Sequence, residues 1–67
     1  RRALRAVVQA TDADDETAAR ALDAAEGDAK AAIVALLTGL PPGRASELLA
    51  AAQGRIRVAL GLAADPD

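Results

Sequence analysis

Cysteine, histidine, methionine and all three aromatic residues are missing from this sequence of 67 residues. Without cysteine or histidine the chain can form no disulfide, thiol nucleophile or imidazole base, and it lacks the usual ligands of zinc. Without aromatic side chains it cannot stack bases as single-strand-binding proteins do. No apolar run approaches the roughly 20 residues of a transmembrane helix, and no signal-peptide pattern is present. We therefore expect no metal, no cofactor, no nucleic acid and no membrane among its ligands.

Alanine is the most frequent residue and leucine is the main large apolar residue. This composition favours helix, because alanine loses no side-chain entropy when it becomes ordered. Chains of this length bury too little apolar surface to be strongly stable. We therefore expect a partner domain or self-association to stabilise the fold. The chain begins with Arg1 rather than Met, which leads us to expect a piece of a longer protein.

A helix–turn–helix pattern occurs twice, in residues 18–33 and in residues 45–60. The two stretches lie 27 positions apart, and six of their sixteen positions are identical, including Gly27 and Gly54. Each copy has an apolar helix face, a glycine break and a second apolar face. The repeat therefore indicates a packing module and not a reactive site.

Apolar residues at helical spacing, with cap and stop signals between them, predict five helices. Asp14 and Asp28 are expected to cap the second and third helices, and Gly27 and Gly39 to end them. Pro42 suits the first turn of the fourth helix. The sequence thus predicts an all-α fold, in which residues 1–40 form a three-helix bundle and residues 41–62 an extra hairpin packed on it, with residues 63–67 as a frayed tail.

Acidic residues gather at the start of the second helix, at Asp12, Asp14, Asp15 and Glu16. A calcium loop needs alternating ligands, a central glycine and a distal glutamate, none of which this cluster has. We interpret Asp14 as a helix cap and the next two acids as residues that complement the positive first turn.

A second acidic group, Asp23, Glu26 and Asp28, contains a carboxylate pair that could perform acid–base chemistry. Nothing apolar and cleft-like in the sequence would raise the pKa of either carboxyl. We interpret this group as a solvated helix end followed by a cap.

Arginines at positions 1, 2 and 5 form the most prominent basic group. Guanidinium groups suit phosphate because they form two parallel hydrogen bonds with it. The alternative is a basic helix face that carries no ligand. Arg55 and Arg57 lie near a helix start and could bind an anion there, or could serve only as exposed solubilising charges.

Two family resemblances follow from these motifs. Residues 11–37 resemble the three-helix ubiquitin-associated domain, a superfamily that includes the N-terminal domain of elongation factor Ts. The resemblance rests on Ala18-x-x-Ala21-Leu22, the Gly27-Asp28 corner and the Ala-Ile-x-x-Leu-Leu run of residues 32–37. It implies a protein-binding module without enzymatic activity. Ubiquitin binding uses an apolar or aromatic loop after the first helix, whereas the loop of residues 11–14 is acidic.

Nearly the whole chain is similar to the C-terminal helical domain of bacterial N-acetylmuramic acid 6-phosphate etherases. The similar segments are residues 2–7, 10–18 and 30–40, with Ala-Ile-Val-x-Leu-Leu-Thr-Gly-Leu at residues 32–40 as the most specific run. Asp12 departs from the usual glycine of the family, and Pro41-Pro42-Gly43 departs from its usual polar cap.

The resemblance to the etherases implies a parent enzyme with an upstream α/β sugar-isomerase-type domain. That family cleaves the lactyl ether of N-acetylmuramic acid 6-phosphate, giving N-acetylglucosamine 6-phosphate and D-lactate. It uses glutamates of the upstream domain and no metal. The family is cytoplasmic, dimeric and active in cell-wall recycling. This chain would then be a non-catalytic lid or packing domain, whose partners are the upstream domain and a second copy of the parent.

One site residue follows from the same resemblance. A related regulatory protein of glucokinase contacts the sugar phosphate through a Lys-x-x-x-Arg pair in its helical lid. The arginine of that pair falls on Arg2, and the lysine position would precede Arg1. The resemblance therefore implies Arg2 as a ligand of the substrate phosphate, and no catalytic residue in this chain. A self-assembling structural fragment is a further alternative.

Overall fold

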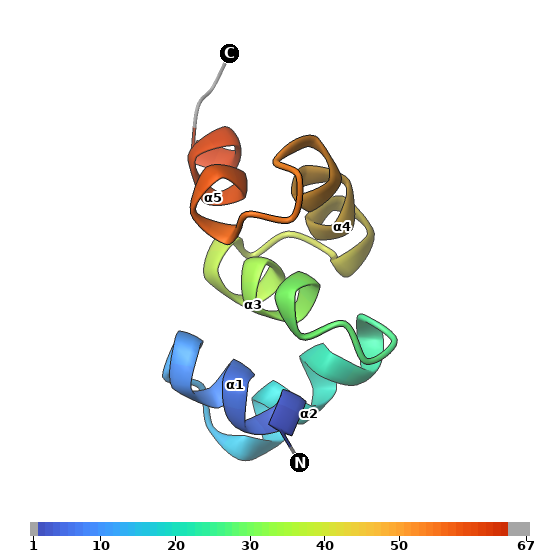
Figure 1. The fold of residues 1–67 in the computed structure, drawn as a ribbon. Helices are drawn as coiled ribbons and strands as arrows, with labels where there is room; N and C mark the ends of the chain where they lie inside the picture. Colours follow the sequence, from blue (N-terminus) through green and yellow to red (C-terminus); the bar gives the residue numbers. More distant parts are fainter. Residues whose placement is uncertain (1, 65–67) are drawn as a thin grey trace.

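The computed structural model describes residues 2–64, and every regular element in this range is a helix. The helices are α1 (Arg2–Thr11), α2 (Asp15–Ala24), α3 (Ala29–Thr38), α4 (Pro42–Ala51) and α5 (Ile56–Ala64). α1 and α2 pack against each other and against α3, and α4 and α5 do the same on the other side of α3 (Figure 1). The predicted all-α fold of five helices is confirmed, with α3 in the middle of the molecule.

The helix ends differ slightly from those expected from the sequence. α1 ends at Thr11, and α5 reaches Ala64. Residues 63 and 64 were assigned to the frayed tail but belong to α5, because Leu62-Ala63-Ala64 is a run of strong helix formers. The rest of the expected tail, residues 65–67, lies outside the described residues. None of the helices between residues 2 and 64 is long and apolar enough to cross a membrane.

The N-terminal caps of α2 and α3 are those predicted, whereas α2 ends at Ala24 with Ala25 as its C-cap, before the predicted stop at Gly27. The Asp14 carboxylate accepts a hydrogen bond from the Thr17 amide at 2.8 Å, and the Asp28 carboxylate accepts one from the Ala31 amide at 3.2 Å. Gly39 ends α3 in the left-handed conformation, with φ of 76°. α4 begins at Pro42 without a side-chain cap, because proline supplies a helical φ and needs no partner for an amide.

The structural repeat is longer than the sequence identities indicate. α1 and α3 begin and end 27 positions apart, and so do α2 and α4. The Thr11 hydroxyl donates to the Val7 carbonyl at 2.6 Å, and the Thr38 hydroxyl donates to the Val34 carbonyl at the same distance. The molecule thus consists of two three-helix units, α1–α2–α3 and α3–α4–α5, that share α3.

The two glycine corners are also equivalent. Gly27 and Gly54 have φ of 85° and 78°, and each follows a left-handed non-glycine residue, Glu26 or Gln53, with φ of 57°. The amide of each glycine donates to a leucine carbonyl five residues earlier, at 2.9 and 2.7 Å. The sequence predicted a glycine break at both corners, whereas the left-handed conformation of Glu26 and Gln53 was not predicted.

Alanine fills much of the core, so the helix backbones lie close together. Val7 and Val34 are the largest side chains that are fully buried, and they occupy equivalent places in α1 and α3. Five consecutive residues of α3, Ala31–Ala35, are buried, because helices cover this element on both sides. No polar or charged side chain is buried within residues 2–64. The fold is therefore an apolar scaffold whose charges all lie on its surface.

Candidate functional site

Arg2 and Arg5 lie on the surface of α1, at and near its amino end. The first turn of α1 carries no acidic residue, so the positive end of the helix dipole adds to the two guanidinium charges. Between residues 2 and 64, neither arginine forms an ion pair or a side-chain hydrogen bond. Arg1, the third member of the predicted basic group, lies outside the described residues. The described pair leaves a positive helix end accessible to an anion.

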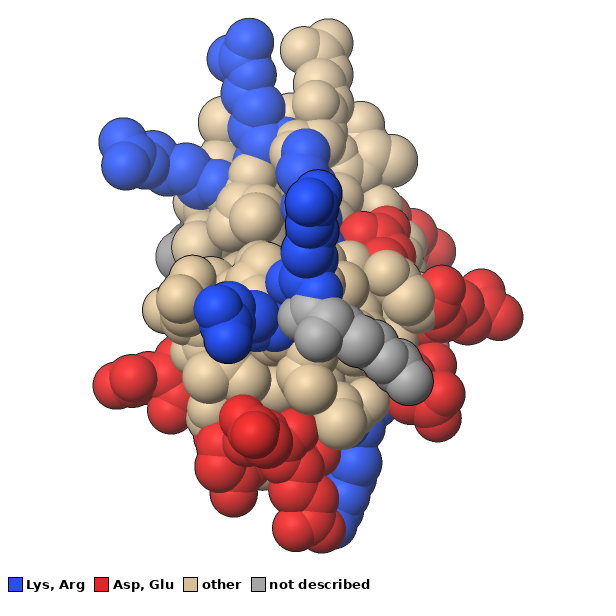
Figure 2. All heavy atoms as spheres, turned by 60° about the horizontal axis from the view of Figure 1, so that its bottom comes forward, with Lys and Arg blue, Asp and Glu red and all other residues tan. Residues whose placement is uncertain are grey.

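Charge is segregated on the face of the molecule that Figure 2 presents. Lys and Arg side chains gather over the upper and central part of this face, whereas Asp and Glu side chains occupy most of its lower edge and its sides. The sequence has the same asymmetry, because residues 12–28 contain seven acids, residues 1–10 contain none and residues 29–60 contain only Glu47. A phosphate would be attracted to the basic part of this surface.

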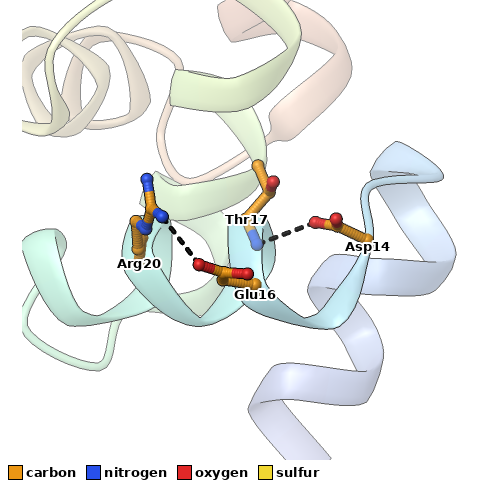
Figure 3. Close-up of polar contacts among 4 residues, drawn as sticks. All are labelled: Asp14, Glu16, Thr17 and Arg20. Atoms are coloured by element: carbon orange, nitrogen blue, oxygen red, sulfur yellow. Dashed lines mark hydrogen bonds and ion pairs between the residues drawn. The ribbon is translucent and has the colours of Figure 1, made fainter.

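The acidic cluster before α2 serves helix structure (Figure 3). Asp14 caps the helix, and Glu16 forms an exposed ion pair with Arg20 at 2.7 Å. The side chain and backbone amide of Thr17 lower the pKa of Asp14, which favours the ionised cap. The interpretation of this cluster as a cap and a first turn is confirmed. Over the described range, no three metal-ligating side chains gather at one place.

The second acidic group is divided among three different positions. Asp28 caps α3, and Glu26 stands in the left-handed corner. Asp23 lines an open groove of about 500 Å³, formed by residues of α1, α2 and the corner. All three side chains are exposed. None lies in buried, apolar surroundings such as those of a carboxyl that acts as an acid catalyst.

Two further surface features escaped the sequence analysis. Lys30 Nζ donates to the Gly54 carbonyl at 3.3 Å, which connects α3 to the second glycine corner across 24 residues. An apolar groove of about 480 Å³ lies between α3 and α5, lined by Leu37, Thr38, Leu40, Leu60 and Ala63. Both features depend on how distant segments pack, so no local sequence pattern predicts them.

Comparison with known proteins gives a consistent set of relatives. The chain is 48% identical over 59 residues to an N-acetylmuramic acid 6-phosphate etherase of Pseudoalteromonas atlantica, a match that covers 88% of this chain and 19% of that protein. It is 55% identical over 60 residues to the etherase of Rubrobacter xylanophilus, covering 90% of this chain and 19% of that protein. With the etherase of Symbiobacterium thermophilum it shares 62% over 39 residues, which are 58% of this chain and 13% of that protein. No family model and no solved structure matches the chain.

The chain spans 19% of the length of the first two of these relatives. The five packed helices make the chain a small all-α domain, which matches only part of these longer relatives. In sequence, it corresponds to the C-terminal part of the N-acetylmuramic acid 6-phosphate etherases, as its motifs had indicated.

Proposed function

We propose that this chain is the non-catalytic lid or packing domain of an N-acetylmuramic acid 6-phosphate etherase. The parent enzyme would cleave the lactyl ether of its substrate to N-acetylglucosamine 6-phosphate and D-lactate. The observation that carries the proposal is 48–55% identity to two such etherases over about nine tenths of the chain. The absence of any buried polar or charged side chain between residues 2 and 64 supports a non-catalytic role. The catalytic groups would then belong to an upstream sugar-isomerase-type domain.

Arg2 is our candidate for contact with the substrate phosphate. It is exposed at the amino end of α1, and no carboxylate of the described part of the chain neutralises it. A planar guanidinium at the positive end of a helix is well suited to a phosphate dianion. Arg2 would close the phosphate end of a site whose reacting groups lie in the upstream domain. We further place the parent enzyme in the cytoplasm, as a homodimer that acts in cell-wall recycling.

The proposal is tested by D-lactate release from N-acetylmuramic acid 6-phosphate, using the full-length protein with and without these 67 residues. We expect release by the intact protein and its collapse on truncation. Arg2→Ala in the intact protein should lower kcat/KM by roughly 10- to 100-fold, because a charge-assisted hydrogen bond contributes about 1.5–3 kcal/mol. Arg44→Ala is the control, since Arg44 is exposed on α4 and forms only a surface ion pair with Glu47.

Other outcomes of this experiment are equally informative. An intact protein that releases no D-lactate would overturn the etherase assignment. Release that survives truncation would contradict the lid role and leave a stabilising appendage. Equal kinetics for the Arg2 and Arg44 variants would remove Arg2 from the phosphate site.

A protein-binding module of the ubiquitin-associated or elongation-factor-Ts type is the second candidate. The three mutually packed helices α1, α2 and α3 favour it. The acidic loop before α2 opposes it, because ubiquitin binding uses an apolar or aromatic loop at this place, and Asp14 already serves as a helix cap. Specific chemical-shift changes around residues 10–14 on titration with a partner protein would support this candidate.

A further inference from the structure

Helices α1, α3 and α5 occupy equivalent places in the structural repeat but are covered differently. In α3, the five consecutive residues Ala31–Ala35 are all buried, because α1 and α2 cover one side and α4 and α5 the other. The positions 27 residues later, in α5, are residues 58–62. Only Ala59 of these is buried, whereas Val58 and Leu62 are each 44% exposed and Gly61 is exposed as well. α5 thus exposes apolar residues at places where α3 is covered.

These exposed residues form one stripe. Val58, Gly61 and Leu62 stand at i, i+3 and i+4, so they share one face of α5. The glycine leaves the backbone open to close approach by another element. We call this surface the α5 stripe.

The opposite end of the repeat has a charged residue at its exposed positions. In α1, the positions equivalent to the buried run of α3 are residues 4–8, and the two exposed ones among them are Arg5 and Ala6. Terminal units of repeat proteins are kept soluble by a polar outer face. The α1 end has the charged residue Arg5 at an exposed position, whereas the α5 stripe has no polar residue.

We propose that the α5 stripe is the surface on which the rest of the etherase polypeptide docks, through an amphipathic helix with small apolar residues on the docking face. This inference rests on the proposed function. The internal repeat defines the chemistry of the partner, because α3 is covered at the equivalent place by α4 and α5, whose buried positions are mostly alanine. These buried residues are Ala45 and Leu49 in α4 and Ala59 in α5, and Ala52, directly after α4, is buried as well.

The size of the stripe favours a segment of the same polypeptide over a second free copy. Stable interfaces between separate chains bury about 800 Å² on each partner, far more than two side chains that are each less than half exposed can supply. A tethered segment needs less, because the link raises its effective concentration to roughly the millimolar range. The relatives provide such a tether, since this chain matches only 19% of their length.

The charges beside the α5 stripe predict the charge of the residues that the docking helix places next to them. Arg57 lies in the first turn of α5 and Arg55 directly precedes the helix, and both are exposed. α5 contains no acidic residue between Ile56 and Ala64. Neither arginine forms an ion pair in the described part of the chain. The docking helix therefore presents Asp or Glu residues toward the amino end of α5.

Cysteine labelling of the full-length etherase tests this docking. The 67 residues contain no cysteine, so Val58→Cys introduces a unique thiol into this domain, and Ser46→Cys places a matched thiol on the exposed face of α4. Both replacements are close in size to the original side chain. We expect maleimide to label the Val58→Cys variant at least about tenfold more slowly than the Ser46→Cys variant, because docking covers the stripe. Peptide mass spectrometry locates the label.

Equal labelling rates in the two variants would overturn the inference. Protection of the Val58→Cys thiol that is lost on dilution would also overturn it, in favour of a second copy as the occupant. D-lactate release by the same preparations tests the proposed function separately. An active enzyme with equal labelling rates rejects only the docking, whereas an inactive protein with a protected thiol rejects only the etherase assignment.

Discussion

At the residue scale, the left-handed backbone positions show where side-chain identity matters most. Gly27 has φ of 85°, and a Cβ placed there would meet no atom within 4 Å. Space is therefore available, and only the backbone conformation opposes a side chain. Gly43 offers a contrast, because it also has open space around it but lies within α4.

We predict opposite effects of alanine at these two glycines. Gly27→Ala should lower the free energy of unfolding by about 1–2 kcal/mol, the cost of a left-handed residue with a Cβ. Gly43→Ala should raise it by roughly 0.5–1 kcal/mol, because alanine loses less entropy in a helix. Urea unfolding of both variants measures the difference. Equal destabilisation by the two substitutions would show that packing, and not backbone conformation, decides the outcome at these sites.

The cap of α2 should make stability depend on pH in the acid range. Hydrogen bonding with Thr17 lowers the pKa of Asp14 from its ordinary value of 3.8. A carboxyl whose pKa is lower in the folded state stabilises the fold above the unfolded pKa, and this stabilisation is lost as the pH falls through the folded value. We therefore expect the original protein to lose stability relative to Asp14→Asn as the pH falls below about 4. Unfolding by urea across this range tests it, and a constant difference would contradict it.

Single residues were predicted well where the signal is local. Asp14, Asp28 and Gly39 act at helix ends as their sequence neighbours indicate. Asp12 is the exception that the structure explains. It adopts φ of 62°, a conformation that glycine adopts most easily and that aspartate tolerates better than most other side chains. Glu26 and Gln53 have no such tendency, so their left-handed conformation follows from the corner and not from their identity.

At the scale of elements, α3 differs from the other helices because it belongs to both units. Val34 in α3 and Val7 in α1 form a matched pair, since both are valines at equivalent positions and both are fully buried. The two positions differ mainly in the number of helices that pack against the helix in which the valine lies. α3 contacts all four other helices, whereas α1 packs mainly on α2 and α3.

We predict that Val34→Ala and Val7→Ala each lower the free energy of unfolding by about 2 kcal/mol. The two substitutions should, however, destabilise different sets of helices. In Val34→Ala, hydrogen-exchange protection should fall in α1, α2, α4 and α5 alike. In Val7→Ala it should fall mainly in α1 and α2, because repeat units depend chiefly on their neighbours. Identical exchange patterns in the two variants would indicate that the five helices open as one unit.

The sequence predicts the individual helices better than it predicts which helices are equivalent in the repeat and which residues other helices cover. The repeat was recognisable in residues 18–33 and 45–60, where glycine and leucine recur. The extension of the repeat to α1 was not recognisable, because equivalent positions such as Arg5 and Ala32 carry residues that differ in both size and polarity. Arg2 was singled out through family resemblance alone, and its role in phosphate binding stays a prediction. The α5 stripe required the structure, since exposure depends on which helices cover a residue.

At the scale of the whole molecule, the two ends of its 34 Å length are chemically distinct. Neither unit is complete alone, because each needs α3, and α3 is apolar on both sides. The sequence-based division at residue 40 separates a bundle from a hairpin. In the structure the hairpin packs on α3, whose residues Ala31–Ala35 are all buried.

We predict that residues 1–40 alone lose the cooperative thermal unfolding of the 67-residue chain. Without α4 and α5, α3 would expose apolar residues that include Val34, and small domains have little stability to lose. Circular dichroism during heating and binding of an apolar dye would report this loss. A cooperative transition of residues 1–40 at the temperature of the whole chain would show that the bundle is an independent domain.

Because α3 belongs to both three-helix units, it also determines how many helices an added repeat would contribute to this fold. Every second helix can act as the end of one bundle and the beginning of the next, so the fold can lengthen by two helices at a time. A chain with a tandem copy of residues 29–55, which is one repeat length of 27 residues, would keep the same two ends and gain one internal unit. Ancestral duplication of such a segment would leave an odd number of helices, as the five described here.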